Sequence, residues 1–552
     1  MKMRVSIFGK DRGKLMRARL ISMLTAAALA VSTLAALPVC AASTSAAKKK
    51  STRTAAAAKA ATGVTISSVV IQGKNVVVTA TGVAATDDGL YHLYAQDPAM
   101  SGVQGAEVAK APAGAAAVFT FPLGNNTAAS MLYKKFTIVG VSSGALKDLS
   151  NDMYILNPEA AAAHTQARHD GGKKGLLPAA ETIRDTKTLK AMGVNQISYN
   201  LPVGDMISGG GVNYSYNGKN YSFNAGIVGQ YDVIVPAMNA AGIQVNLILL
   251  CGANSGILIH PLSRGVGANY YMFNTVDQAG LEELEAVASF LGQRYSGTGH
   301  GTVDNWIVGN EVNARNEWNY MDPSAGLAGF AKAYADELRV FYNGIKSQNA
   351  NARVYAATDQ EWQSDNPALH YGSREFLTQL NAQITSEGNF DWSLSNHPYN
   401  FPLYEPNTLT SKPQVTHNQA SRYITMSNID VLTDFMCQKQ FLNPAGQVRS
   451  IVLSEVGFTS SAAVGSNELM QAADVVFAIN QANVNQHIDG IIINRQRSDV
   501  SEIAQGLDYG LIGVNGAPKQ AYTWFMTAES PDTIAAASAV LGKDITASLV
   551  VR

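Results

Sequence analysis

The segment IVGNEVNARNEW, residues 307–318, carries an apolar run that stops at a glycine and is followed by an amide and a carboxylate. Residues 306–308, WIV, have the pattern of a short buried strand, and Asn310 and Glu311 stand just past its end. A second segment has the same form, because IVLSEVGF, residues 451–458, runs apolar into Glu455. Two strands that each end on a glutamate raise the question of whether the two carboxylates share one site.

The chain from residue 173 onward alternates strand-like and helix-like stretches. Strands are expected over 175–177, 196–200, 244–250, 305–308, 353–357, 392–395, 450–453 and 490–493. Helical patterns lie between them, over 181–192, 231–241, 281–295, 331–348 and 468–484. This alternation predicts a (β/α)8 TIM barrel over residues 173–552. The alternative is an open doubly wound sheet, although no glycine-rich phosphate-binding fingerprint follows an early strand.

Residues 63–160 have a different pattern. The stretch VTISSVVIQGKNVVVTATGV, residues 64–83, consists of β-branched runs broken by Gly-Lys-Asn, and further short strand-like runs follow it. Such spacing predicts a small antiparallel β-sandwich that precedes the barrel, in a chain of the α/β class. The sandwich either binds sugar or braces its neighbour, and its aromatic content favours the brace.

The N-terminus resembles a secretory leader. Residues 1–41 contain seven Lys/Arg and one acid, followed by an apolar run over 20–37, which predicts a signal peptide cut near Val39-Cys40-Ala41. An uncut membrane anchor is the alternative. Residues 42–62 form an Ala/Lys/Ser/Thr tract that cannot bury a core and is typical of a flexible spacer. Its basic residues could contact an anionic cell wall, or it is a solvated linker. The expected location is extracellular, with no membrane contact after cleavage.

Composition narrows the function classes. The 552 residues are 46% hydrophobic and 15% charged, as in soluble globular proteins, and the net charge of −1 argues against a nucleic-acid partner. Beyond the leader, Cys251 and Cys437 remain, and Cys251 follows an apolar run, so we expect a buried thiol and no disulfide. No His/Cys cluster has metal-ligand spacing, and no cofactor is expected.

The expected barrel brings the two glutamates together. Glu311 follows the fourth strand and Glu455 the seventh, and these strands face each other across the barrel mouth, where active sites lie. Two facing carboxylates can hydrolyse a glycosidic bond. A lone glutamate past a strand is more often a helix-cap neighbour or part of a surface ion pair. The prediction of a hydrolytic site therefore depends on the matched positions of Glu311 and Glu455. Asp359 and Glu361, past the fifth strand, are rival acids expected to face the same cleft.

The two segments resemble those of clan A glycoside hydrolases, which are retaining TIM-barrel enzymes. WIVGNEVN, residues 306–313, is similar to the clan's strand-four signature, and IVLSEVGF to its strand-seven segment. The resemblance implies a β-linked glycan cleaved with retention, with Glu311 as acid/base and Glu455 as nucleophile. It also implies that Asn310 bonds the sugar 2-hydroxyl. His397 and Tyr399 match a His-x-Tyr after strand six, whose tyrosine lies near the nucleophile.

The chain departs from the clan pattern at two strand ends. Many clan members end strand eight on a tryptophan that floors the sugar subsite, but here Ile493 precedes Asn494-Arg495-Gln496-Arg497. Arg495 or Gln496 would have to bind the sugar by hydrogen bonds, or Arg497 and Asp499 form a rim salt bridge. Strand two ends on Tyr199-Asn200 where the clan has an arginine. We therefore also expect Asn200 at the substrate, and Trp362 either stacks on a sugar or packs under a loop.

These observations predict a secreted glycoside hydrolase that acts on a polysaccharide or oligosaccharide. The alternative is a non-catalytic carbohydrate-binding or cell-surface scaffolding protein that keeps the barrel, and a weaker one is a barrel enzyme with unrelated chemistry. The insert around Asn213 to Tyr221 has a hairpin pattern, and we expect it to shield part of the cleft mouth.

Overall fold

The computed structural model describes residues 63–364, 366–461 and 467–552. The expected signal peptide and spacer therefore lie outside the described residues. Among the helices that the structure does describe, none is both long enough and apolar enough to span a bilayer.

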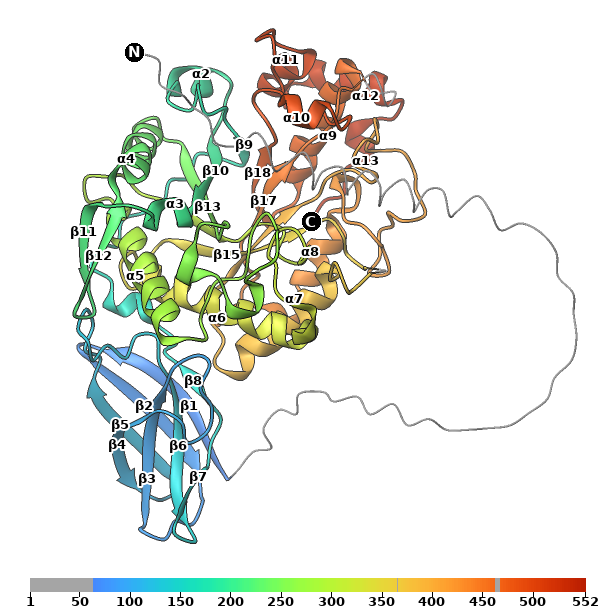
Figure 1. Cartoon of the computed structure of the whole chain (residues 1–552). Helices are drawn as coiled ribbons and strands as arrows, with labels where there is room; N and C mark the ends of the chain where they lie inside the picture. The colour runs from blue at the N-terminus through green and yellow to red at the C-terminus, as the bar shows by residue number, and fades with distance from the viewer. Residues whose placement is uncertain (1–62, 365, 462–466) are drawn as a thin grey trace, which may run out of the picture. The chain divides into compact units, whose positions relative to one another are not determined.

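The N-terminal strands form two antiparallel sheets, of which one has the order β1-β2-β5 and the other β4-β3-β6-β7, with β8 paired to β6. In β1, Val64, Ile66, Val69 and Ile71 are buried, so the β-branched residues face the core and the polar ones face solvent. These strands, blue to cyan in Figure 1, are β1 (Val64–Gln72), β2 (Asn75–Gly82), β3 (Leu90–Gln96), β4 (Ala106–Pro112), β5 (Ala116–Pro122), β6 (Lys135–Ser142), β7 (Ala145–Asp148) and β8 (Met153–Tyr154).

The strands that follow close into a parallel barrel, which confirms the TIM-barrel prediction and rules out the open sheet. The last strand pairs with the first, with Ile491 in register with Lys174. Both faces of the strands are covered, so a strand such as QVNLILL is buried at every position. The barrel strands are β9 (Lys174–Leu176), β10 (Gln196–Pro202), β13 (Gln244–Leu250), β14 (Asn305–Val308), β15 (Arg353–Asp359), β16 (Ser393–His397), β17 (Ile451–Val456) and β18 (Ile488–Ile493).

Helices α2 to α9 lie in the connections between the barrel strands, and α10 to α13 follow the last strand (Figure 1). They are α2 (Thr186–Ala191), α3 (Val203–Ile207), α4 (Ala225–Ala240), α5 (Gln278–Arg294), α6 (Gly326–Lys346), α7 (Ser373–Ser386), α8 (Asp430–Met436), α9 (Glu468–Val484), α10 (Val500–Ile503), α11 (Gln520–Met526), α12 (Pro531–Leu541) and α13 (Ile545–Ser548). Short 3-10 helices are η1 (Pro158–Ala161), η2 (Gly256–Leu258), η3 (Pro261–Ser263), η4 (Pro323–Ala325), η5 (Met426–Asn428) and η6 (Lys439–Phe441). Cys251 and Cys437 are free thiols, and Cys251 is buried, as expected.

The hairpin of β11 (Gly211–Tyr216) and β12 (Lys219–Asn224) packs against α5. Tyr214 shares a 2.8 Å hydrogen bond with the Ser289 hydroxyl, and its ring lies 5.4 Å from that of Phe290. The hairpin also reaches the N-terminal part of α5, where Lys219 pairs with Glu282 and the Tyr221 hydroxyl donates to the Glu282 carbonyl at 3.3 Å. The hairpin therefore lies along α5, and its expected shielding of the cleft mouth stays a prediction.

The sandwich and the barrel share hydrogen bonds between buried groups. The hydroxyl of Tyr133 lies 2.9 Å from that of Tyr216, and Asn343 donates to the carbonyl of Leu132 at 2.9 Å. Lys135, which is buried, pairs with Glu387 at 3.0 Å. These contacts join the two parts of the chain, and the role of the sandwich as a brace stays a prediction.

Candidate active site

The two glutamates leave their strands in different ways. Glu455 is the fifth residue of β17, so its direction is set by the strand. Glu311 lies beyond the end of β14, after Gly309 with φ of 74°, and itself has φ of 44°. That left-handed backbone is uncommon outside glycine, and such conformations persist where the surrounding structure enforces them. It turns the Glu311 side chain out of the strand direction.

His397, the last residue of β16, brings the two carboxylates together. Its Nδ1 lies 3.0 Å from Oε1 of Glu311 and 3.6 Å from Oε2 of Glu455. One carboxylate oxygen from each glutamate and a ring nitrogen of His397 all lie within 4.8 Å of one another. The carboxyl groups of retaining glycosidases are about 5–5.5 Å apart, whereas inverting enzymes need about 6.5–9.5 Å. The spacing of Glu311 and Glu455 therefore fits the retaining geometry.

The tautomer of His397 follows from its partners. An ionised carboxylate only accepts hydrogen bonds, so Nδ1 carries the hydrogen whenever Glu311 has lost its proton. On the other side of the ring, Nε2 lies 2.8 Å from the Ser454 hydroxyl, which can donate or accept. The ring is buried, with 1% of its side chain exposed, so both contacts hold it in one orientation.

The Tyr399 side chain is a hydrogen-bond donor to Glu455. Its hydroxyl donates to Oε2 of Glu455 at 3.0 Å, and it accepts a 2.7 Å hydrogen bond from Nδ2 of Asn494. The Asn494 amide donates to the Tyr399 hydroxyl oxygen, so the hydroxyl cannot donate its own hydrogen to Asn494. That hydrogen is directed to the Glu455 carboxylate instead. Burial, and next the charge of Glu455, raises the pKa of Tyr399 well above its usual value, so the phenol stays a neutral donor.

Burial dominates the electrostatics of Glu311. Burial raises the pKa of Glu311 above its ordinary value of 4.5, although the hydrogen bond from His397 opposes this. For His397, burial lowers the pKa, but the charges of Glu455 and Glu311 outweigh it and leave the pKa raised. Trp306 does not supply the apolar surroundings of Glu311, because its buried ring packs near Tyr295 at the end of α5. Glu311 is thus suited to hold a proton that it can donate.

Glu311, His397 and Glu455 also offer three ligand atoms close enough for one divalent cation. The contact from Nδ1 to Glu311, however, has the length of an N–H···O hydrogen bond, and a proton at Nδ1 occupies the direction that a metal would need. We therefore interpret the cluster as a proton-sharing group.

Residues 166–548 match the model of a family of unknown function, DUF5722. The chain belongs to this family. None of the curated proteins matches the chain significantly.

Several solved structures of glycosidases are similar to the DUF5722 chain. A family 39 glycoside hydrolase from Bacteroides cellulosilyticus is 14% identical over 82% of this chain and 79% of its own, with a TM-score of 0.44. A β-D-glucuronidase from Dictyoglomus thermophilum is 12% identical over 85% and 69%, with a TM-score of 0.37. A β-glucosidase from Pyrococcus furiosus is 14% identical over 67% and 88%, with a TM-score of 0.42. The similarity concerns the fold, and the chemistry proposed below depends on none of these proteins.

Two predicted substrate residues of the DUF5722 chain are buried and cannot contact a sugar. Trp362 has no exposed surface, and its ring packs edge-on against Phe435 with centroids 5.0 Å apart. Gln496 is 2% exposed, and its side-chain oxygen accepts hydrogen bonds from Ala179 and Thr182. For both residues the sequence prediction of substrate binding is wrong, because each side chain packs within the protein.

His397 and Tyr399, also predicted at the substrate, are buried, at 1% and 7% exposed, and contact the glutamates. Asn310, Asn200 and Arg495 keep some exposure, and their substrate contacts stay predictions. Asn310 is half-buried beside Glu311, and Asn200 is exposed at the end of β10. Arg495 has 28% of its side chain exposed and pairs with Asp499 at 3.4 Å and Glu502 at 3.3 Å. The rim salt bridge expected between Arg497 and Asp499 is wrong, because Arg497 pairs with Glu181 instead.

Sequence reasoning missed three groups of the site. Ser454 directly precedes Glu455 and orients His397, while Asn494 directly follows β18 and orients Tyr399. Ser454 and Asn494 could have been found from the sequence, because both stand at the ends of predicted barrel strands, where site residues are expected. His370 was missed altogether, and it lies 3.0 Å from Asp359, one of the rival acids. No periodic pattern marks His370, because it stands in a loop.

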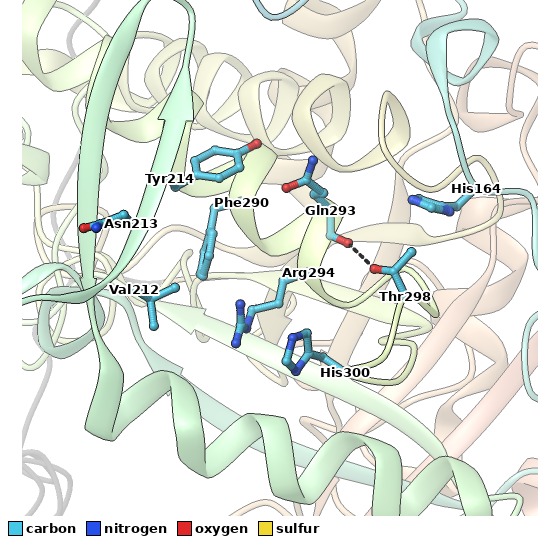
Figure 2. Close-up of a pocket in the computed structure, with 9 residues that line it drawn as sticks. All are labelled: His164, Val212, Asn213, Tyr214, Phe290, Gln293, Arg294, Thr298 and His300. Carbon is cyan, nitrogen blue, oxygen red and sulfur yellow. Dashed lines mark hydrogen bonds between the residues drawn. The ribbon is translucent and has the colours of Figure 1, made fainter.

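A separate pocket of about 400 Å³ lies against the hairpin and α5 (Figure 2). Its basic side chains are His164, Arg294 and His300, and of these Arg294 and His300 face Asp232, at 2.6 Å and 3.3 Å. The charges of Arg294 and His300 are therefore compensated by Asp232, and the pocket holds none of the residues predicted for the substrate site.

Proposed function

We propose that the chain is a retaining β-glycoside hydrolase in which Glu311 is the acid/base and Glu455 the nucleophile. The observation that carries the proposal is the pair of carboxylates at the ends of β14 and β17, with oxygens within 4.8 Å and His397 between them. The unequal surroundings of the two carboxyl groups support the division of labour.

In the first step the Glu455 carboxylate attacks the anomeric carbon while the glycosidic bond breaks. Glu311 transfers its proton to the leaving oxygen, so the first product leaves as an alcohol and a glycosyl ester remains on Glu455. The Nδ1–H of His397, 3.0 Å from Glu311, stabilises the charge that Glu311 then acquires.

In the second step Glu311 removes a proton from water, and the resulting oxygen nucleophile attacks the anomeric carbon. The ester bond breaks, Glu455 recovers its charge, and the sugar is released with its original configuration. As the negative charge returns to Glu455, the hydrogen bond from Tyr399 at 3.0 Å is available to stabilise it.

The test is hydrolysis of a panel of aryl β-glycosides and β-linked polysaccharides, with the product anomer followed by proton NMR. We expect Glu455→Gln to abolish turnover. We expect Glu311→Gln to lower it by roughly 10²–10⁴-fold for poor leaving groups and by less for aryl glycosides with acidic leaving groups, which need no proton. Glu375→Gln, an exposed helix position, is the matched control. Full turnover in either site variant would refute the assignment.

The second candidate is a sugar-binding or scaffolding protein without turnover, favoured by the ion-paired Arg495 where related barrels carry an aromatic floor. It predicts that the wild-type chain binds glycans on an array and hydrolyses none of them. Glu311→Gln would then leave binding intact.

We also propose that the chain is secreted after cleavage near Ala41 and meets its glycan outside the cell, on the basis of the N-terminal sequence. N-terminal sequencing of the protein recovered from culture medium tests this. A cell-bound protein with an intact N-terminus would contradict it.

A further inference from the structure

The turn that carries Glu311 is bound to a distant segment, residues 369–371. Tyr371 N–H donates to the carbonyl of Asn313 at 2.8 Å, and Asn316 N–H donates to the carbonyl of Leu369 at 3.0 Å. Because His370 stands between these two bonds, its backbone is held directly against the loop that follows Glu311.

The same turn is bound to the end of β15 through Asn313 and Asp359. Nδ2 of Asn313 donates to Oδ1 of Asp359 at 2.7 Å, and Asp359 N–H donates to Oδ1 of Asn313 at 3.0 Å. In addition, Val312 N–H donates to the carbonyl of Ala357 at 3.2 Å. The left-handed backbone at Glu311 is thus enforced by bonds on the two residues that follow it.

Counting hydrogens shows which atoms of His370 are protonated. Nδ2 of Asn313 also lies 3.1 Å from Nε2 of His370, but its two hydrogens are directed to Asp359 at 2.7 Å and to the carbonyl of Tyr371 at 3.0 Å. The Asp359 carboxylate only accepts, so its 3.0 Å contact with Nε2 needs a hydrogen on Nε2. Nδ1 lies 3.5 Å from Oε2 of Glu361, a second acceptor. Carboxylates on both sides favour the doubly protonated ring.

We propose that Asp359 and His370 are positioning residues that set the proton affinity of Glu311 from behind, while Asn313 fixes its direction. This inference rests on the proposed acid/base role of Glu311. None of the three is a catalytic residue in our proposal, since each acts through Glu311. The two charges have opposite effects on the pKa of Glu311. The Asp359 carboxylate favours the protonated form of Glu311, and the His370 imidazolium favours the ionised form.

The charges agree with this arrangement. The Asp359 charge acts to raise the pKa of Glu311, and the pKa of Asp359 itself is lowered, because His370 and its other hydrogen-bond donors outweigh its burial. Burial opposes the charge on His370, but Asp359 and Glu361 raise the pKa of its ring to about 9. The titratable groups that act on or respond to Glu311 are His397 on β16, Glu455 on β17, Asp359 on β15, His370, Tyr399 and Tyr509.

The experiment measures the pKa of Glu311 in variants of the full-length protein by carbon-13 NMR of labelled glutamate carboxyl groups, with Glu311→Gln identifying the resonance. His370→Gln leaves Asp359 uncompensated, so the pKa should rise, by about half a unit or more. Asp359→Asn removes the anion, so the pKa should fall. The basic limb of the kcat/KM profile should move in the same two directions.

His417→Gln is the matched control, because His417 pairs with Asp430 at 2.9 Å outside this cluster. It should leave the Glu311 pKa unchanged. Shifts in the same direction for His370→Gln and Asp359→Asn, or no shift in either, would overturn the inference. If Asp359→Asn fails to fold, His370→Gln decides alone, since a rise is required. An inactive wild-type protein would refute the hydrolase and not this inference, because NMR reads the Glu311 pKa without turnover.

Discussion

Nδ1 of His397 lies 3.0 Å from Oε1 of Glu311. The resemblance to clan A placed the tyrosine of the His-x-Tyr segment near Glu455, and the Tyr399 hydroxyl lies 3.0 Å from it. His397 stands between the two carboxylates and is closer to Glu311. Glu311 thus has His397 as its hydrogen-bond donor, and Ser454 orients that ring. Glu455 has Tyr399 as its donor, and Asn494 orients that hydroxyl.

Replacement of His397 by Gln should lower kcat by about a hundredfold or more, because the donor that stabilises the charge on Glu311 is lost. KM should change little, since His397 is 1% exposed and lies out of reach of the sugar. Steady-state kinetics on one aryl glycoside measure both. A large rise in KM with an unchanged kcat would show that His397 contacts substrate instead.

Tyr399→Phe should reduce kcat by roughly 10–100-fold, because Glu455 loses a donor whose hydrogen is directed to it by Asn494. Tyr509→Phe is a close control, since this ring lies 5.5 Å from that of Tyr399 and its buried hydroxyl has no hydrogen-bond partner among the described residues. Equal losses in the two variants would mean that packing, and not the hydrogen bond, is responsible.

The cost of burying Glu311 should be visible in stability. Its pKa is raised in the folded state, so folding binds this proton more tightly than the unfolded chain does. The stabilisation is fully present below the ordinary pKa of 4.5 and is lost as the pH rises through the folded value. Glu311→Gln should therefore gain in Tm relative to wild type as the pH increases from 4 to 8. A Tm difference independent of pH would contradict the assigned direction.

The sequence predicted the barrel well because each strand is a short apolar run bounded by polar or glycine residues. The predicted spans 244–250 and 305–308 coincide with β13 and β14. Closure and strand order then follow from the count and the right-handed βα connection. Glu311 and Glu455 were found for the same reason, since strand ends are visible in sequence and strands four and seven face each other.

Side-chain direction past a strand end was not predictable. Trp362 and Gln496 each stand three residues beyond a strand, where no period of two applies, and both are buried. Asn494, one residue past β18, was passed over in favour of Arg495, which has the longer side chain but pairs with Asp499. His370 depends on the backbone bonds of a long loop, and no local pattern in the sequence specifies such pairing.

Trp362→Phe should lower the free energy of unfolding by roughly 1–3 kcal/mol, because it leaves space beside Phe435 in a buried site. KM should stay close to the wild-type value, since the ring has no exposed face. Urea unfolding and glycoside kinetics check the two parts. Unchanged stability together with a tenfold rise in KM would restore the stacking role that the sequence suggested.

Treatment with a chelator should leave hydrolysis unchanged, because a proton on Nδ1 of His397 links the two carboxylates in the arrangement described here. Excess Zn²⁺ should inhibit, and more strongly as the pH rises, since the metal must displace that proton before it can bind the ring nitrogen. Activity assays after dialysis against EDTA, followed by titration with Zn²⁺, measure both effects. If EDTA abolished hydrolysis and Zn²⁺ restored it, Glu311, His397 and Glu455 would be a metal centre, and hydrolysis through a glycosyl ester on Glu455 would be wrong.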